Sequence, residues 1–358
     1  MDTKAKCKEK RITKYSNKNK DELIQILLPE DAIQQETPKS GKYTLIDLFC
    51  GTGAFSHAFH KTNKVMTIFA NDMIDSSEEI FNLNRESESD IKLTKRNLID
   101  IKDCDIPKSD IVTGGFPCQP FSIAGMQKGF EDERSNVFWK ILSILKNNNS
   151  NIVILENVKN LQSHDDGKTF QTIIENLKNL EYHIKYAILN TSKVTGIPQN
   201  RERIYIVCFK DKSHYDKFDF DFPEVELKPL SLFLEKENDI LEKYYYTNST
   251  MIYDKLQKNV TKHISTNTIY QYRRYYVREN KNNVCPTLTA NMGTGGHNVP
   301  IILDDKGIRK LTPRECFNLQ GFPSDYKLPA LSANKLYSLA GNAVSFPVVA
   351  LIANRLLN

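Results

Sequence analysis

The 358-residue sequence lacks several features that would assign it to a specialised class of protein. No apolar run is long enough to span a bilayer, and no charged-then-apolar leader opens the chain. Its seven cysteines form no Cys-x-x-Cys pair, and its seven histidines show no metal-ligand spacing. We therefore expect a cytoplasmic protein with no membrane contact, no disulfide framework and no structural metal.

Charge is unevenly distributed in a composition that is otherwise typical of a soluble globular protein, with 40% hydrophobic and 26% charged residues. Residues 1–20 contain eight Lys or Arg and two acids. This segment is either a solvated, flexible tail or a source of sequence-independent attraction to phosphates. Residues 251–300 contain seven Lys or Arg, two acids and five tyrosines, which suggests a polyanionic partner.

Strand-like and helix-like segments alternate from Tyr43 to about residue 211. The strand patterns lie at residues 43–49, 65–70, 110–113, 152–155, 182–189 and 203–209, and the helix patterns at 54 onward, 76–84, 136–146 and 168–180. Such alternation predicts an α/β fold with a mostly parallel sheet covered on both faces. Residues 213–307 show little helical period and predict a small, irregular strand-and-loop domain. A helix start returns at Thr312-Pro313-Arg314-Glu315.

One cysteine, Cys118, lies in the segment Pro117-Cys118-Gln119-Pro120, directly after the short apolar run Ile111-Val112. Each proline fixes its own φ and restricts the residue before it, so the thiol is held rigidly. A strand that ends in this turn places the thiol at the carboxyl edge of a sheet, where open α/β folds bind their ligands. Because lone cysteines are more often inert than catalytic, the functional interpretation requires partners elsewhere in the chain.

A glycine turn, Gly51-Thr52-Gly53, follows the first predicted strand. The third glycine of the dinucleotide-binding pattern is absent, because Ser56 stands in its place. Asp72 ends the next predicted strand, 19 residues after Gly53, where a carboxylate commonly hydrogen-bonds ribose hydroxyls. The pair suggests a nucleoside cofactor without a pyrophosphate, and S-adenosylmethionine fits that description.

Glu156 follows the apolar run 152–155 and is expected at the same sheet edge. It either caps a turn or acts beside the cysteine as an acid or hydrogen-bonding partner whose pKa burial can shift. Gln199, Arg201 and Arg203 alternate along one extended face. They form either a solvated charged strand or a surface that recognises a carbonyl or a phosphate.

Six motifs together resemble those of the DNA (cytosine-5)-methyltransferase family, in the family's order. They are Asp47-Leu48-Phe49-Cys50-Gly51-Thr52-Gly53, Gly115-Phe116-Pro117-Cys118-Gln119, Glu156-Asn157-Val158, Gln199-Asn200-Arg201-Glu202-Arg203, Arg314-Glu315-Cys316 with Gln320-Gly321-Phe322-Pro323, and Gly341-Asn342-Ala343-Val344. The resemblance runs from about Tyr43 to the C-terminus. It implies a Rossmann-like methyltransferase sheet with a smaller, mostly β or irregular target-recognition domain. We predict a basic, flexible extension at 1–42, a catalytic domain at 43–212, target recognition at 213–307, and a return to the catalytic domain at 308–358.

The resemblance also implies the chemistry of four residues. Cys118 would add as a thiolate to C6 of a flipped-out cytosine, which makes C5 nucleophilic. Glu156 would hydrogen-bond the N3/N4 edge and stabilise the charge that develops there. Arg203 would lie near the base carbonyl, and Arg201 would support the active-site structure. Loss of the C5 proton and elimination of Cys118 would then release 5-methylcytosine.

Cofactor and DNA contacts are implied by the same resemblance. S-adenosylmethionine would bind at Phe49, Gly51, Gly53, Asp72, Met73, Asn97, Pro117, Asn342 and Ala343. Asn97 stands where the family often has an acid, and Cys50, where the family usually has another small residue, is interpreted as packing. DNA would be contacted by Gln119, Ser122, Arg273, Arg274, Arg278 and Thr287, with Thr287 near the phosphate of the flipped nucleotide. Arginines can read guanine, but we expect at least two of these three to touch only phosphates.

The sequence therefore predicts a monomeric DNA (cytosine-5-)-methyltransferase of bacterial or phage type that methylates a short specific site in double-stranded DNA. It would use S-adenosylmethionine and no metal, and a cognate restriction endonuclease could act on the same site. One alternative is an RNA (tRNA) cytosine-5 methyltransferase on the same fold. Another is a DNA-binding regulator that uses the Lys-rich N-terminus, although that segment has no convincing helix-turn-helix pattern. The Asp/Asn-Pro-Pro-aromatic motif of enzymes that methylate exocyclic amino groups is absent.

Overall fold

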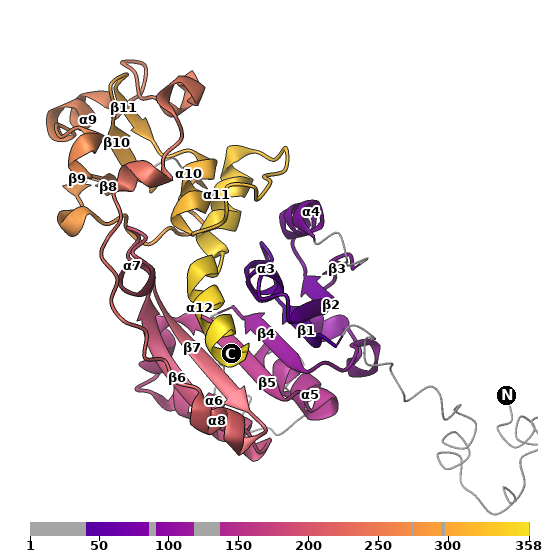
Figure 1. Ribbon diagram of the computed structural model, residues 1–358. Coiled ribbons are helices and arrows are strands. Elements are labelled where there is room, and N and C mark those ends of the chain that lie inside the picture. The colour runs from indigo at the N-terminus through magenta and orange to yellow at the C-terminus, as the bar shows by residue number, and fades with distance from the viewer. Residues whose placement is uncertain (1–40, 86–90, 118–136, 274, 295–297, 358) are drawn as a thin grey trace, which may run out of the picture. The chain divides into compact units, whose positions relative to one another are not determined.

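The computed structural model describes residues 41–85, 91–117, 137–273, 275–294 and 298–357. Residues Lys42–Asn358 form one compact unit. Its described part contains a large sheet, a small sheet and the helices that cover them (Figure 1).

The large sheet has seven strands in the order β3-β2-β1-β4-β5-β7-β6. Neighbouring strands from β3 to β5 are parallel, whereas β7 runs antiparallel to both β5 and β6. The predicted α/β fold with a mostly parallel sheet is confirmed. The strands are β1 (Tyr43–Leu48), β2 (Val65–Asp72), β3 (Thr94–Lys95), β4 (Ile111–Gly115), β5 (Ile152–Val158), β6 (His183–Asn190) and β7 (Glu202–Phe209).

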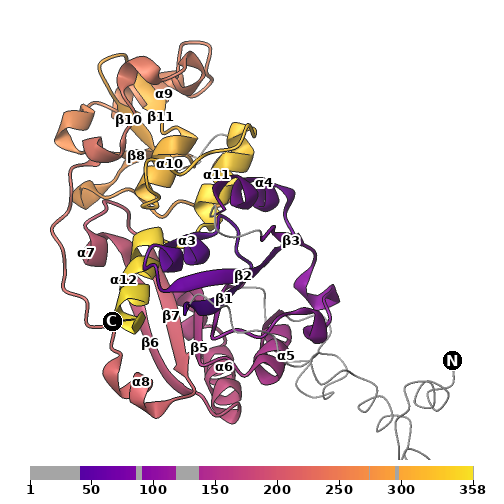
Figure 2. The same cartoon turned by 45° about the vertical axis from the view of Figure 1, so that its right-hand side comes forward.

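Helices cover both faces of this sheet, because alternate residues of each central strand point to opposite sides. Leu45, Ile111 and Ile154 pack on the face that carries α3 (Ala54–His60) and α12 (Phe346–Leu357). Ile46 and Val153 pack on the other face with α5 (Val137–Asn148) and α6 (Lys168–Asn179). Figure 2 shows α12 and α3 on one side of the strands and α5 and α6 on the other.

Most predicted elements lie within a few residues of their observed bounds, but one boundary bears on function. The sequence places Glu156 just after a strand that ends at residue 155, whereas β5 continues to Val158. The strand is longer because β7 pairs with it as far as Val158, a partner that local sequence does not reveal. Short elements absent from the prediction are β3, α7 (Thr191–Thr195) and α8 (Lys212–Lys217), while α4 (Asp75–Asn84) matches its predicted helix.

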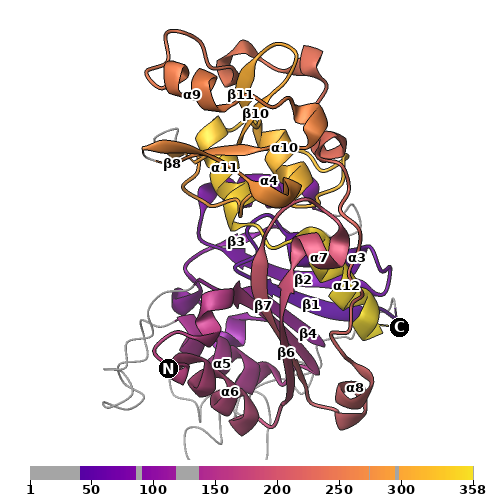
Figure 3. The same ribbon diagram turned by 90° about the vertical axis from the view of Figure 1, so that its left-hand side faces the viewer.

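The small sheet is antiparallel, in the order β11-β10-β8-β9, and lies with α9 (Tyr253–Asn259) in the region predicted to be a strand-and-loop domain. Its own core contains Leu256, Tyr270 and Ile301. Figure 3 shows α10 and α11 between this sheet and the large one. The strands are β8 (Tyr270–Arg273), β9 (Tyr276–Glu279), β10 (Ile301–Leu303) and β11 (Ile308–Lys310), so the sheet extends beyond residue 307.

The C-terminal helices return to the large sheet. Helix α10 (Pro313–Leu319) begins as predicted, with the Thr312 hydroxyl accepting from the Glu315 amide and the Glu315 side chain accepting from the Thr312 amide. The stretch Ala333–Leu357 is long and apolar enough to cross a membrane, but 67% of its most apolar window is buried in the protein. It comprises two core helices, α11 (Ala333–Asn342) and α12.

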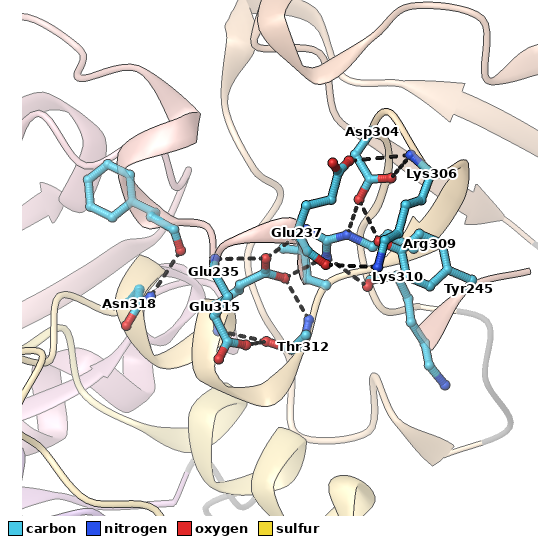
Figure 4. Close-up of polar contacts among 12 residues, drawn as sticks. Glu235, Glu237, Tyr245, Asp304, Lys306, Arg309, Lys310, Thr312, Glu315 and Asn318 are labelled. Carbon is cyan, nitrogen blue, oxygen red and sulfur yellow. Dashed lines mark hydrogen bonds and ion pairs between the residues drawn. The ribbon is translucent and has the colours of Figure 1, made fainter. Parts of the chain in front are cut away.

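A buried ion network joins the small sheet to α10 (Figure 4). Arg309 on β11 contacts Glu315 through two nitrogens at 2.8 Å each, and its Nε lies 2.5 Å from Asp304 Oδ2. The chain entering the small domain joins the same network, because the Glu235 amide donates to Glu315 and Thr312 donates to the Glu235 carboxylate. Three separate stretches of chain are therefore held by one group of charges.

Candidate active site

A pocket of about 610 Å³ lies where β1, β2 and β4 end. That volume is within the range of about 300–1,000 Å³ typical of small-molecule sites, and the location is the carboxyl edge of a doubly wound sheet. Its walls come from the β1–α3 turn, the ends of β2 and β4, the later part of β5, and residues 338–344. Eleven of the predicted site residues line it: Phe49, Gly51, Asp72, Met73, Asn97, Pro117, Glu156, Arg201, Arg203, Asn342 and Ala343.

The glycine turn forms one half of the pocket. Phe49 has a φ of 54°, a left-handed conformation that is strained for a bulky residue and often marks a functional site. Asp72 Oδ2 accepts from the Gly51 amide at 2.9 Å, and Oδ1 accepts from the Ile74 amide at 3.0 Å. Burial raises the pKa of Asp72, and these hydrogen bonds oppose that shift. The Met73 amide and the Ser77 hydroxyl also donate to this carboxylate, which lies at the pocket wall as a hydrogen-bond acceptor.

Three predicted cofactor contacts differ in their surroundings. Met73 is 64% exposed at the pocket wall. Asn97 also lies at the wall, where its side chain accepts from the Ile99 amide and so caps a short 3-10 turn. Gly53 does not line the pocket, because it packs on Phe81: a Cβ there would lie 3.0 Å from the Phe81 ring.

An ion pair between Glu156 and Arg203 occupies the other half. Glu156 Oε1 lies 3.1 Å from Arg203 Nε, and both side chains are largely buried. Glu156 Oε2 faces Gly115, where an added Cβ would lie 3.4 Å away. Burial raises the pKa of Glu156, while Arg203 and Arg201 oppose that rise. The carboxyl group lies at the pocket wall, where it can form a hydrogen bond with a ligand.

Arg201 is buried and links separate chain segments through hydrogen bonds. Its guanidinium donates to the carbonyls of Leu288, Gly341 and Ala343 at 3.0, 3.1 and 2.7 Å. Gln199 also contacts Leu288, because Gln199 Oε1 accepts from the Leu288 amide at 3.5 Å while Gln199 Nε2 donates to the Leu319 carbonyl at 2.8 Å. Of the three residues predicted to share a face, Arg201 and Arg203 line the pocket and Gln199 does not, and the regular strand β7 begins only at Glu202.

Comparison with known proteins agrees with this geometry. The family model described as C-5 cytosine-specific DNA methylase matches residues 43–358. The chain is 45% identical over 314 residues to Type II methyltransferase M.Bsp6I of Bacillus sp. (strain RFL6), covering 87% of this chain and 98% of that protein. It is 32% identical to Type II methyltransferase M.HhaI of Haemophilus parahaemolyticus, covering 86% of this chain and 92% of that protein. The chain belongs to the C-5 cytosine-specific DNA methylase family.

The fold is shared with more distant solved structures. The crystal structure of the S. pombe Dnmt2 methyltransferase aligns with a TM-score of 0.66 at 21% identity, covering 88% of this chain and 98% of that one. The predicted enzyme class, DNA (cytosine-5-)-methyltransferase, is confirmed by the family match. The names of the relatives support the restriction-modification type.

The segment that leads to the methylase's predicted nucleophile is anchored by Asn157, for which the sequence analysis proposes no role. Asn157 Nδ2 donates to the Phe116 carbonyl at 3.0 Å, directly before Pro117. Its position next to Glu156 in the Glu-Asn-Val motif is the signal that could have identified it. Three predicted residues of this segment, Cys118, Gln119 and Ser122, lie outside the described residues.

Asp47 is a second residue that sequence reasoning left without a role. It is fully buried, where Oδ2 accepts from the Ser56 amide and hydroxyl and Oδ1 accepts from the Thr113 hydroxyl at 2.9 Å. These bonds tie β1 to α3 and β4 just below the glycine turn. Burial raises the pKa of Asp47 to about 6. Its place two residues before the predicted Phe49 contact is the available sequence signal.

None of the predicted DNA contacts that the structure describes, Arg273, Arg278 and Thr287, lines the methylase pocket. Arg273 is exposed at the end of β8, and Arg278 on β9 donates to Asn280 Oδ1 at 3.1 and 2.9 Å. The Thr287 hydroxyl donates to the Asn200 carbonyl, next to Arg201. Arg274 lies outside the described residues. Within the part of the chain that is described, no cluster of three His, Cys, Asp or Glu is placed to hold a metal ion.

Proposed function

We propose that this methyltransferase transfers a methyl group from S-adenosylmethionine to C5 of a cytosine flipped out of duplex DNA, within a short specific sequence, through a covalent bond between Cys118 and C6. The observation that supports this most directly is that one pocket contains both Asp72, with the glycine turn beside it, and the Glu156–Arg203 ion pair. A nucleoside cofactor and a base can therefore lie side by side.

The residues present fit the cofactor. Asp72 places a carboxylate acceptor at the end of β2, and the surrounding wall is supplied by Phe49, Gly51, Met73, Asn97, Pro117, Asn342 and Ala343. When bound, S-adenosylmethionine supplies an electrophilic methyl group. Glycine suits position 51, because its φ of +51° is a backbone conformation that residues with a Cβ rarely adopt.

The chain's own residues would act on the base in sequence. The Cys118 thiolate adds to C6, and the electron pair of the 5,6 double bond moves so that C5 becomes nucleophilic. Glu156 hydrogen-bonds the N3/N4 edge and balances the charge that develops on the ring, while Arg203 fixes the Glu156 carboxylate and lies near the base carbonyl. After C5 gains the methyl group it loses its proton, and expulsion of the Cys118 thiolate restores the double bond.

Covalent trapping tests this proposal. The protein is incubated with S-adenosylmethionine and duplex DNA that carries 5-fluorocytosine in many sequence contexts, with a tRNA pool in parallel. Fluorine cannot leave C5 as a proton does, so the adduct should persist under denaturing conditions. Cys118→Ser should form none, whereas Cys104→Ser, which changes an exposed cysteine, should match the wild type.

Mass spectrometry of the trapped peptide then identifies the nucleophile and the recognised sequence. An adduct on DNA through Cys118 supports the proposal, and one through the pocket cysteine Cys50 would transfer the nucleophile's role to that residue. An adduct confined to RNA would replace DNA with tRNA as the substrate. Absence of an adduct on either nucleic acid would contradict the covalent mechanism.

We also propose that the enzyme acts as a monomer in the cytoplasm, and that a cognate endonuclease recognises the same site. One flipped base per catalytic event requires only one active site. Native mass spectrometry of the enzyme with one short duplex checks the stoichiometry. A complex with two protein chains on one duplex would contradict the monomer.

A further inference from the structure

Tyr205 is a buried tyrosine directly beside the catalytic ion pair. It lies opposite Glu156 in the β5–β7 register, and side chains directly opposite in an antiparallel pair point to the same face. Arg203 is two residues away on the same strand and points to that face too. On the other side of Tyr205, its cross-strand neighbour is Ala187 on β6, which is small and carries no polar side chain.

Two polar atoms near this point have no hydrogen-bond partner among the described residues: the Tyr205 hydroxyl and Arg201 Nε. Tyr205 is 1% exposed and Arg201 is 2% exposed, so bulk water does not reach them. A buried donor or acceptor that stays unpaired is destabilising, and native proteins rarely contain one. The charged groups whose electrostatic interaction reaches the Tyr205 hydroxyl are Glu156, Arg201 and Arg203.

Phenylalanine would fill the same apolar space without this cost. The ring of Tyr205 packs in the core with Ile154 and Val207, and a hydroxyl adds nothing to that packing. The hydroxyl therefore needs a polar partner, and the charged groups that act on it belong to the active site.

We propose that Tyr205 is a positioning residue for the methylation reaction: its hydroxyl and Arg201 Nε–H bind one buried water molecule, which holds the Glu156 carboxylate in the orientation that meets the base. A buried water requires two to four polar partners, and these three groups supply them. The inference rests on the proposed role of Glu156 and adds a residue that does not itself touch the substrate.

Such a water changes two properties of Glu156. As a donor to the carboxylate, it favours the ionised form and opposes the effect of burial. It also fixes Oε1 toward Arg203, so that Oε2, beside Gly115, remains available to the ligand. Among the described residues, the charged groups that lower the pKa of Glu156 are Arg203 and Arg201.

The test compares Tyr205→Phe with Tyr182→Phe in the full-length protein. Both variants remove one buried hydroxyl, but that of Tyr182 donates to the Ser150 carbonyl at 2.9 Å, outside the pocket. Single-turnover methyl transfer and KM for DNA and cofactor are measured across pH. Glu156→Gln identifies the limb of the pH profile that Glu156 controls. Circular dichroism establishes that each variant is folded at the assay temperature.

For Tyr205→Phe we expect a roughly tenfold lower methyl-transfer rate, unchanged KM values, and displacement of the Glu156 limb to higher pH. Tyr182→Phe should lower the melting temperature without moving that limb. Equal pH profiles for Tyr205→Phe and wild type would overturn the inference, as would a loss of stability alone. Covalent trapping distinguishes a failure of the proposed function from a failure of this inference. If the wild type forms no adduct, the proposed function is contradicted. If the wild type forms the adduct but Tyr205→Phe has the same rate and pH profile as the wild type, only this inference is contradicted.

Discussion

At the scale of single residues, the pocket depends on carboxyl groups that the fold has removed from water. Burial raises the pKa of Asp47, Asp72 and Glu156. Each is retained in a specific set of hydrogen bonds or an ion pair, which offsets part of the desolvation cost. The site is therefore sensitive to isosteric changes that leave the size of the side chain unaltered.

Asp47→Asn should change how stability depends on pH. The folded-state pKa of Asp47 is about 6, above its ordinary value of 3.8, so the folded protein binds this proton more tightly than the unfolded chain. Asp47 stabilises the folded protein most when the pH is below its ordinary pKa, and this stabilisation is lost as the pH rises through the folded-state pKa. Asparagine does not titrate, so Asp47→Asn does not undergo this loss. Its free energy of unfolding relative to wild type should therefore rise by about 2–3 kcal/mol between about pH 4 and about pH 7.

Urea unfolding at several pH values measures this difference. Asp239→Asn, at an exposed position, is the matched control. A difference between Asp47→Asn and wild type that is constant across pH would contradict the buried titration.

At the scale of elements, the return of α11 to the pocket depends on close backbone contact. A Cβ on Gly341 would overlap the carbonyl group of Thr289 and the amide nitrogen of Ala290. Gly341→Ala should therefore cost about 3 kcal/mol of stability and displace a carbonyl that Arg201 binds. Gly114→Ala is the control, because its Cβ would meet neighbours at 3.6 Å, an ordinary contact. Equal midpoints of thermal unfolding for the two variants would contradict this account.

The ion network at the junction of the small sheet and α10 gives a second prediction at this scale. Arg309→Met leaves Glu315 and Asp304 buried without their cation, and should cost about 3–5 kcal/mol of unfolding free energy. Lys193→Met removes an exposed pair with Glu224 and should leave stability unchanged. Chemical denaturation of both variants measures the contrast, and a stable Arg309→Met protein would show that Arg309 is dispensable.

At the scale of the whole molecule, charge on the small domain should govern attraction to DNA. Arg273 is exposed at the end of β8, and Arg273→Ala should lower the slope of log affinity against log salt by about 1 if it contacts a phosphate. Lys178→Ala, at an exposed position on α6, is the control. Binding isotherms at several salt concentrations measure both slopes. An unchanged slope with a loss of site preference would instead indicate that Arg273 reads a base.

The basic segment 1–41 gives the remaining prediction. The family match begins at residue 43, and Lys42–Asn358 form a compact unit without it. Its removal should weaken DNA binding at low salt while leaving the methylated sequence and the melting temperature unchanged. Bisulfite sequencing of methylated plasmid and thermal unfolding are the measurements. A changed target sequence would assign the segment a part in recognition.

The sequence by itself determined the fold class, the order of the elements and most of the pocket wall. Periodicity depends on local burial, so most strands and helices from β1 to β7 could be predicted, with the short β3 and α7 as exceptions, and the Thr312 capping box is a local pattern. Strand ends place Phe49, Asp72 and Glu156 at one edge because parallel strands share a direction.

Only the tertiary structure decided which of these groups meet. The extension of β5 to Val158 depends on pairing with β7, and Gln199 donates to the Leu319 carbonyl at the end of α10, 120 residues away in the chain. The burial of Asp47 and Tyr205 and the three carbonyls around Arg201 come from segments far apart in the chain. Hydrogen bonds and desolvation depend on distances in space, which a linear pattern of residues does not contain.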